Sequence, residues 1–181
     1  MAKRAGNTKK VALGGTLSAL SLTLMLVGSI LPFSEYITVV LAGLVLVIVS
    51  GELGLRYAFT VYCVVALLSS ILLPSKELAM LFVMLFGYYP LIKYRLDSLG
   101  RLCGTIAKLA LFNISMTINY LVLLYLFTTS KLLESFEDSN LYLIILLYVL
   151  GNIFFVVYDK FVAVAWRTYF TQIAPIIKRI F

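Results

Sequence analysis

The sequence predicts an all-α, polytopic membrane protein with six transmembrane helices and both termini in the cytoplasm. Of its 181 residues, 62% are hydrophobic and the mean hydropathy is +1.05, which is more apolar surface than a soluble domain of this size can bury. Apolar runs of about 20 residues, the length needed to cross a bilayer, recur along the chain, and the charged residues collect between them. We therefore expect a single helical membrane domain over residues 1–181, with lipid covering most of its surface.

Each predicted span is an apolar run bounded by charged or turn-forming residues. The first run follows a basic N-terminus and is too long for the core of a secretory signal, so we expect it to remain in the protein. A charged corner at 52–56 separates the second and third runs, and a turn at 74–77 separates the third and fourth. The fourth run is short, and Gly87 and Pro90 predict a bend near its end. The predicted spans are 11–31, 37–54, 57–73, 78–92, 106–127 and 141–158.

The orientation follows from the positions of the cations. With the N-terminus inside, only Lys76 and Lys131 of the fifteen Lys and Arg residues lie outside, as the positive-inside rule requires. The segment 160–181 is basic and amphipathic, and its apolar stretches are too interrupted for a seventh span, so we expect it along the cytoplasmic surface. The net charge of +7 then faces anionic lipid headgroups of a bacterial cell membrane rather than nucleic acid.

The sequence carries no pattern that is typical of an enzyme. It has no histidine and two cysteines, Cys63 and Cys103, and it lacks a phosphate-binding loop, a nucleophile elbow and a metal-binding carboxylate cluster. We therefore expect no catalytic residue, no metal and no cofactor, and any transport must draw its energy from another subunit. Charges at the inner ends of spans are interpreted as structural fastening, and the i, i+4 spacing of Glu52 with Arg56 and of Lys93 with Asp97 allows local ion pairs.

Small residues crowd the first predicted span. Gly15, Ala19 and Thr23 recur at every fourth position, and Gly14 and Ser18 form a neighbouring row. Such rows allow a second helix to approach closely, which provides van der Waals packing in lipid. One interpretation is packing against the protein's own helices. The other is docking of a separate membrane subunit on the row of Gly15, Ala19 and Thr23.

Polar side chains are densest in the fifth predicted span. Asn113, Thr117 and Tyr120 follow helical spacing on one stripe, and Asn119 lies on an adjoining stripe. One interpretation is hydrogen bonding between helices that holds the bundle together. The other is a ligand pocket in the outer half of the membrane. Its candidate residues are Asn119, Tyr120, Tyr148 and Asn152, of which the last two lie in the sixth span.

With these features the chain resembles the substrate-binding S components of energy-coupling factor (ECF) vitamin transporters. Its length, six spans, cytoplasmic termini and small-residue first helix agree with that group. In the family, an alanine-rich row on the first helix docks against a transmembrane coupling subunit that is joined to two ATPases, and the vitamin binds in the outer half; here the row begins with glycine instead of alanine. The resemblance implies that Gly15 and Ala19 belong to the docking row. It also adds Glu35 and Lys76, near the outer loops, to the ligand-binding candidates.

The leading hypothesis is therefore a substrate-capturing membrane subunit of an ATP-driven uptake transporter. Its ligand would be a small, mostly uncharged organic nutrient such as a vitamin. The alternative is a non-transporting scaffold or interaction subunit of a larger membrane complex. Capture requires a cavity of roughly 300–1,000 Å³, whereas a scaffold predicts polar side chains that satisfy one another.

Overall fold

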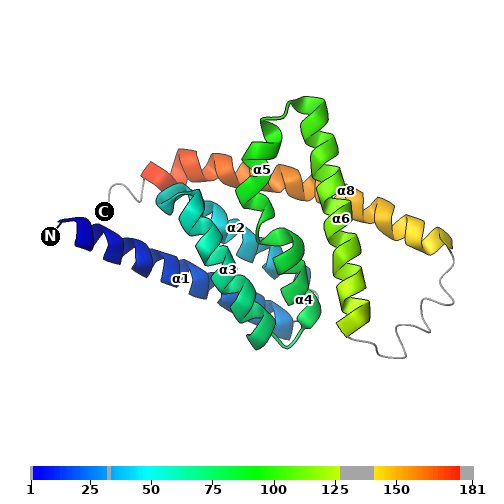
Figure 1. Cartoon of the computed structure of the whole chain (residues 1–181), viewed down its shortest axis with the longest axis horizontal. Coiled ribbons are helices and arrows are strands. Elements are labelled where there is room, and N and C mark those ends of the chain that lie inside the picture. The colour runs from blue at the N-terminus through cyan, green and yellow to red at the C-terminus, as the bar shows by residue number, and fades with distance from the viewer. Residues whose placement is uncertain (1, 32–33, 127–140, 176–181) are drawn as a thin grey trace. The chain divides into compact units, whose positions relative to one another are not determined.

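The computed structural model describes residues 2–31, 34–126 and 141–175, and every regular element within them is a helix (Figure 1). Six helical stretches of this part are long and apolar enough to cross a membrane, which confirms the predicted all-α, six-span architecture. The predicted loop at 128–140 lies outside the described residues. The elements are α1 (Ala2–Ile30), α2 (Glu35–Leu53), α3 (Leu55–Leu72), α4 (Lys76–Leu81), η1 (Phe82–Phe86), α5 (Tyr89–Asp97), α6 (Arg101–Leu126), α8 (Leu141–Thr168) and η2 (Tyr169–Ile173).

The chain forms two compact units, and each is described by itself. Unit 1 comprises the residues up to Tyr94 together with those from Val162 onward. Unit 2 is the segment Arg95–Phe161. The chain passes from unit 1 to unit 2 within α5 and returns within α8, so both helices contribute residues to both units.

Helix α2 lies at the centre of unit 1: it is apolar on every side, and eight of its residues are buried. Helices α1 and α3 pack against α2 and against each other, as Figure 1 shows. The hydroxyl of Ser21 on α1 donates to the carbonyl of Ala42 on α2 at 3.2 Å. A Cβ at Gly43 would lie 2.2 Å from the carbonyl oxygen of Phe86, so only glycine permits η1 to approach the α2 backbone this closely.

The fourth span is longer than predicted and bends where expected. It extends from Lys76 to Asp97, against the predicted 78–92. Element η1 is one turn of π-helix, in which the Gly87 amide donates to the Phe82 carbonyl, five residues earlier, at 2.8 Å. The break follows at Gly87, and Pro90 lies at the start of α5, where its missing N–H is not needed.

The sequence predicts that a surface tail begins at residue 160, whereas α8 extends past this position as one continuous helix. The helix continues through residue 158 to Thr168, because the sequence holds no glycine or proline between Asn152 and Ala174 to end it. The Trp166 indole donates to the Pro90 carbonyl at 3.2 Å, and the Tyr169 hydroxyl donates to the Glu52 carboxylate at 2.6 Å. Both aromatic side chains are buried, so this segment is packed into unit 1.

Candidate functional site

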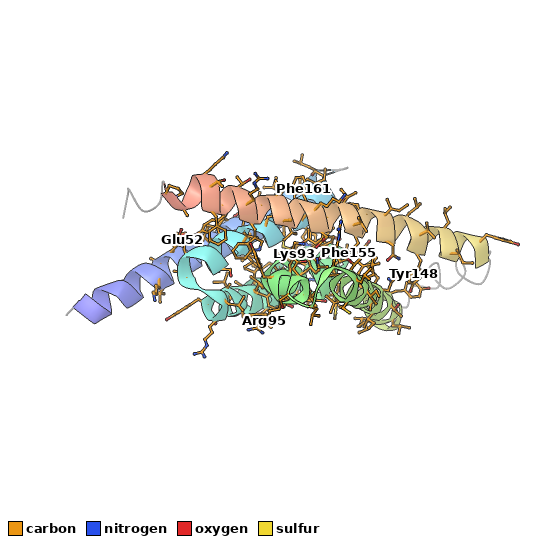
Figure 2. All side chains as sticks on the ribbon, turned by 90° about the horizontal axis from the view of Figure 1, so that it is seen from above. Glu52, Lys93, Arg95, Tyr148, Phe155 and Phe161 are labelled. Atoms are coloured by element: carbon orange, nitrogen blue, oxygen red, sulfur yellow. The ribbon has the colours of Figure 1, made fainter. Side chains whose placement is uncertain are left out.

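Helices α6 and α8 of unit 2 contact each other through side chains that pair in reverse order along the two helices. On α8 the members are three or four residues apart, so they line one side of that helix. The contacts join Lys108 to Asp159, Phe112 to Phe155, Asn113 to Asn152 and Thr117 to Tyr148. Figure 2 labels Tyr148 and Phe155 on α8. The two hydrogen-bonded pairs, Asn113 with Asn152 and Thr117 with Tyr148, are called the polar seam below.

The two asparagines of the polar seam form a reciprocal amide pair. Asn113 Nδ2 donates to Asn152 Oδ1 at 2.9 Å, and Asn152 Nδ2 donates to Asn113 Oδ1 at 3.1 Å. Each Nδ2 also donates to the backbone carbonyl four residues earlier on its own helix, Leu109 at 2.8 Å and Tyr148 at 2.8 Å. An amide in a membrane span needs such partners, because hydrocarbon supplies none.

The hydroxyls of the polar seam form a second, directed contact. Thr117 Oγ1 lies 2.8 Å from the Asn113 carbonyl, to which it can only donate, and 2.9 Å from Tyr148 Oη. Because the Thr117 hydrogen is used by the carbonyl, Tyr148 is the donor in the contact between the two hydroxyls. The chain of bonds therefore runs from Tyr148 through Thr117 to the backbone of α6.

On α8, the side that carries the polar seam continues into a ring stack and a charged cluster. The rings of Phe112 and Phe155 are stacked, with centroids 4.6 Å apart. Lys108 is buried and forms ion pairs with Asp97 and, at 3.4 Å, with Asp159. A buried cation held by two carboxylates is a structural contact between helices, and these partners differ from the i, i+4 pairs expected from the sequence.

A groove of about 570 Å³ opens beside the polar seam. None of its lining residues is charged, and its only side-chain polar groups are the Tyr148 hydroxyl and the Asn152 amide. The Tyr148 side chain is 40% exposed, so it is accessible from the groove while its hydroxyl bonds α6. The lining residues are Leu109, Ile145, Tyr148, Val149, Asn152, Ile153 and Val156.

The other two candidates from the polar spans do not line this groove. Asn119 is only 4% exposed, and its Oδ1 has no hydrogen-bond partner within the described part of the chain. Tyr120 is 37% exposed on a different side of α6 from Asn119. Of the four residues expected to form one pocket, the groove therefore brings together Tyr148 and Asn152.

Glu35 and Lys76, which the family resemblance added, belong to unit 1. Lys76 Nζ donates to the carbonyls of Ser70, Ile71 and Leu73, at 2.9, 3.3 and 3.0 Å. It thus caps the C-terminal end of α3, where a cation also suits the helix dipole. Glu35 is the first residue of α2. The groove belongs to unit 2, so these two residues are not among its lining side chains.

The two small-residue rows of α1 have opposite environments. Gly14 and Ser18 are buried, and a Cβ at Gly14 would contact Val61 at 3.5 Å. Gly15, Ala19 and Thr23 are exposed, and a Cβ at Gly15 would meet no atom within 4 Å. The first row therefore packs inside unit 1, whereas the second leaves a shallow, accessible surface on α1.

The walls of the groove could not be found from the sequence. Leu109, Val149, Ile153 and Val156 are aliphatic, as are most residues of every span, so nothing distinguishes them before the helices are placed. Among the described residues there is no group of three or more His, Cys, Asp or Glu side chains that could hold a metal ion. The groove therefore offers an apolar surface with two neutral polar groups.

No family model, no curated protein and no solved structure matches this chain. Function is inferred from the groove, the polar seam and the exposed row of α1.

Proposed function

We propose that this chain is an integral membrane subunit that captures a small, mostly uncharged organic molecule for an ATP-driven uptake system. The observation that carries the proposal is the groove beside the polar seam. Its volume of about 570 Å³ lies within the usual range for small-molecule sites, roughly 300–1,000 Å³. Its lining is apolar apart from the neutral groups of Tyr148 and Asn152, so it favours a ligand without formal charge.

The exposed row of Gly15, Ala19 and Thr23 supports a partner subunit. Small residues on an exposed helix face allow a second transmembrane helix to approach its backbone. The chain has no phosphate-binding loop, so the partner must supply ATP hydrolysis. The resemblance to ECF S components points to the same arrangement, with a coupling subunit and ATPases. With both termini cytoplasmic, Tyr148 lies in the outer half of the membrane, on the side from which a nutrient arrives.

The test is purification of a tagged copy from its native host together with surrounding lipid. Mass spectrometry then identifies the co-purifying proteins and any small molecule released on denaturation. We expect ATPase and membrane coupling subunits together with one organic molecule in near-stoichiometric amount. Recovery of the chain without ATPase subunits, under conditions that preserve membrane complexes, would contradict the proposal.

A matched pair of variants locates the bound molecule. Val149 lines the groove and Val157 does not, although both are exposed valines of α8. Val149→Trp fills the groove and should abolish release of the small molecule while the partner proteins remain. Val157→Trp should leave both unchanged. Equal release from the two variants would place the ligand elsewhere.

The second candidate function is a scaffold subunit, and one observation favours it. The side chains of the polar seam satisfy one another, as expected of contacts that only hold helices together. A scaffold predicts partner proteins without any released small molecule, and it predicts identical behaviour of Val149→Trp and Val157→Trp. The same purification therefore separates the two functions.

A further inference from the structure

Every hydrogen-bond donor of the polar seam is already used within the protein. An asparagine amide has two N–H hydrogens. In Asn113 they go to the Leu109 carbonyl and to Asn152 Oδ1, and in Asn152 they go to the Tyr148 carbonyl and to Asn113 Oδ1. The hydroxyl hydrogen of Thr117 goes to the Asn113 carbonyl, which leaves the Tyr148 hydrogen for Thr117 Oγ1.

The direction of these bonds follows from the backbone. Exchanging the oxygen and nitrogen of either amide would place its oxygen against a backbone carbonyl, at Leu109 or at Tyr148. Two acceptors cannot share a hydrogen bond, so both amides have the orientation described. The same reasoning fixes Thr117 as a donor to the backbone and Tyr148 as a donor to Thr117.

The polar seam still has unused hydrogen-bond acceptors, although all of its side-chain donors are used. A hydroxyl oxygen and an amide oxygen each carry two lone pairs. Asn152 Oδ1 accepts one bond, from Asn113, and Tyr148 Oη accepts none within the described part of the chain. Both residues line the groove. The groove therefore presents unused acceptors and no unused side-chain donor from the polar seam.

We infer that the groove selects molecules that combine an apolar body with an O–H or N–H donor, such as a phenol, an alcohol or a neutral N–H heterocycle. This inference rests on the proposed capture function and narrows its ligand class. A molecule with acceptors only would face the lone pairs of Tyr148 and Asn152 and gain nothing from them. A lipid acyl chain would fill the groove without using either oxygen.

The test compares two photoreactive probes that differ by one donor. One is a para-alkylphenol with a diazirine in its alkyl chain, and the other is its methyl ether. The full chain is reconstituted in nanodiscs of palmitoyl-oleoyl phosphatidylcholine and irradiated with each probe, and the labelled peptides are quantified by mass spectrometry. Labelling of α8 residues 145–156 is divided by labelling of exposed α3 residues such as Leu67, which corrects for the amount of probe in the lipid.

We expect the phenol to exceed the ether about fivefold in this ratio, as one net hydrogen bond predicts. The ether enters lipid more readily, so partitioning cannot produce that preference. Tyr148→Phe removes one acceptor and should lower the preference, whereas Tyr142→Phe, an exposed α8 tyrosine outside the groove, should retain it.

The outcomes separate the inference from the function on which it rests. Enrichment of both probes at 145–156 to the same extent, or a preference for the ether, would overturn the donor requirement while leaving a groove that binds small molecules. Labelling of 145–156 no stronger than labelling of α3, with either probe, would overturn the groove as a capture site. An unchanged phenol preference in Tyr148→Phe would remove Tyr148 from the recognition.

Discussion

Asn113 of α6 and Asn152 of α8 hydrogen-bond each other in both directions, with Nδ2 to Oδ1 distances of 2.9 and 3.1 Å. Each amide is also tied to the backbone of its own helix. Removing one partner leaves a donor and an acceptor of the other unmatched in a membrane span. Removing both leaves nothing unmatched, so the two substitutions should not act independently.

Single and double replacement of this pair by leucine tests that coupling. Asn113→Leu and Asn152→Leu should each lower the free energy of unfolding by about 1–2 kcal/mol, and the double variant should lose less than the sum by about 1 kcal/mol. Unfolding by sodium dodecyl sulfate in mixed micelles measures each value. As a control, Thr60→Val removes a hydroxyl that bonds only the Arg56 carbonyl on its own helix, and it should add independently to Asn152→Leu. Full additivity within the asparagine pair would show that the seam does not hold the helices.

Alanine at two glycines should have opposite effects on stability. At Gly43 a Cβ would lie 2.2 Å from the Phe86 carbonyl oxygen, and a backbone atom cannot move aside as a flexible side chain can. Gly43→Ala should therefore destabilise the protein by about 1–3 kcal/mol. Gly15→Ala meets no atom within 4 Å and should be neutral or slightly stabilising, because alanine is the better helix former. Unfolding by sodium dodecyl sulfate measures the free energy of unfolding of both variants. Equal changes in Gly43→Ala and Gly15→Ala would contradict the close contact between α2 and η1.

A bulky residue in the exposed row of α1 should block partner binding without unfolding the chain. Ala19 is exposed, so Ala19→Trp should leave the unfolding midpoint unchanged and reduce co-purified ATPase subunits by about tenfold or more. Leu67→Trp, on an exposed face of α3, is the matched control and should recover the partners normally. Undiminished recovery with Ala19→Trp would show that this row is not the docking surface.

The expected orientation is testable with native and introduced cysteines. Cys103 is exposed near the start of α6, on the side predicted to face the cytoplasm. In a Cys63→Ser background, a membrane-impermeant maleimide added to intact cells should leave Cys103 unlabelled until the cells are permeabilised. Ser75→Cys, in the turn between α3 and α4, should be labelled at once when Cys103 is replaced by serine. Labelling of Cys103 in intact cells, together with protection of Ser75→Cys, would show that the orientation is the reverse of the one predicted.

Much of the fold could be predicted because hydropathy reports membrane spans directly. The first five predicted runs begin and end within about five residues of the helical stretches that could cross a membrane, and Gly87 and Pro90 indicated the bend in the fourth. The predicted end of the sixth run at 158 is not the end of the helix, because hydropathy reports where lipid contact ends and not where helical hydrogen bonding ends. Helix α8 continues past 158 into buried contacts made by Trp166 and Tyr169.

The candidate site was predicted less completely, for a geometric reason. Helical spacing correctly placed Asn113 and Thr117 on one stripe of α6, apart from Asn119. It could not tell which stripe faces α8, because a span with apolar residues on all sides leaves the rotation of the helix about its axis open. Asn119 was therefore grouped with Tyr148 and Asn152, whereas the hydrogen bonds join those two residues to Thr117 and Asn113.

The π turn at Phe82–Phe86 determines how the fourth span would respond to the deletion of one residue. A π turn has one more residue in each hydrogen-bonded ring than an α turn. A carbonyl of this turn, that of Val83, accepts a hydrogen bond from the Tyr62 hydroxyl at 2.8 Å. Deleting one residue from an ordinary transmembrane helix rotates everything beyond it by about 100° and misplaces a whole face. If the deleted residue lies within Phe82–Phe86, the π turn would instead become an α turn, and the side chains of α5 would keep their orientation.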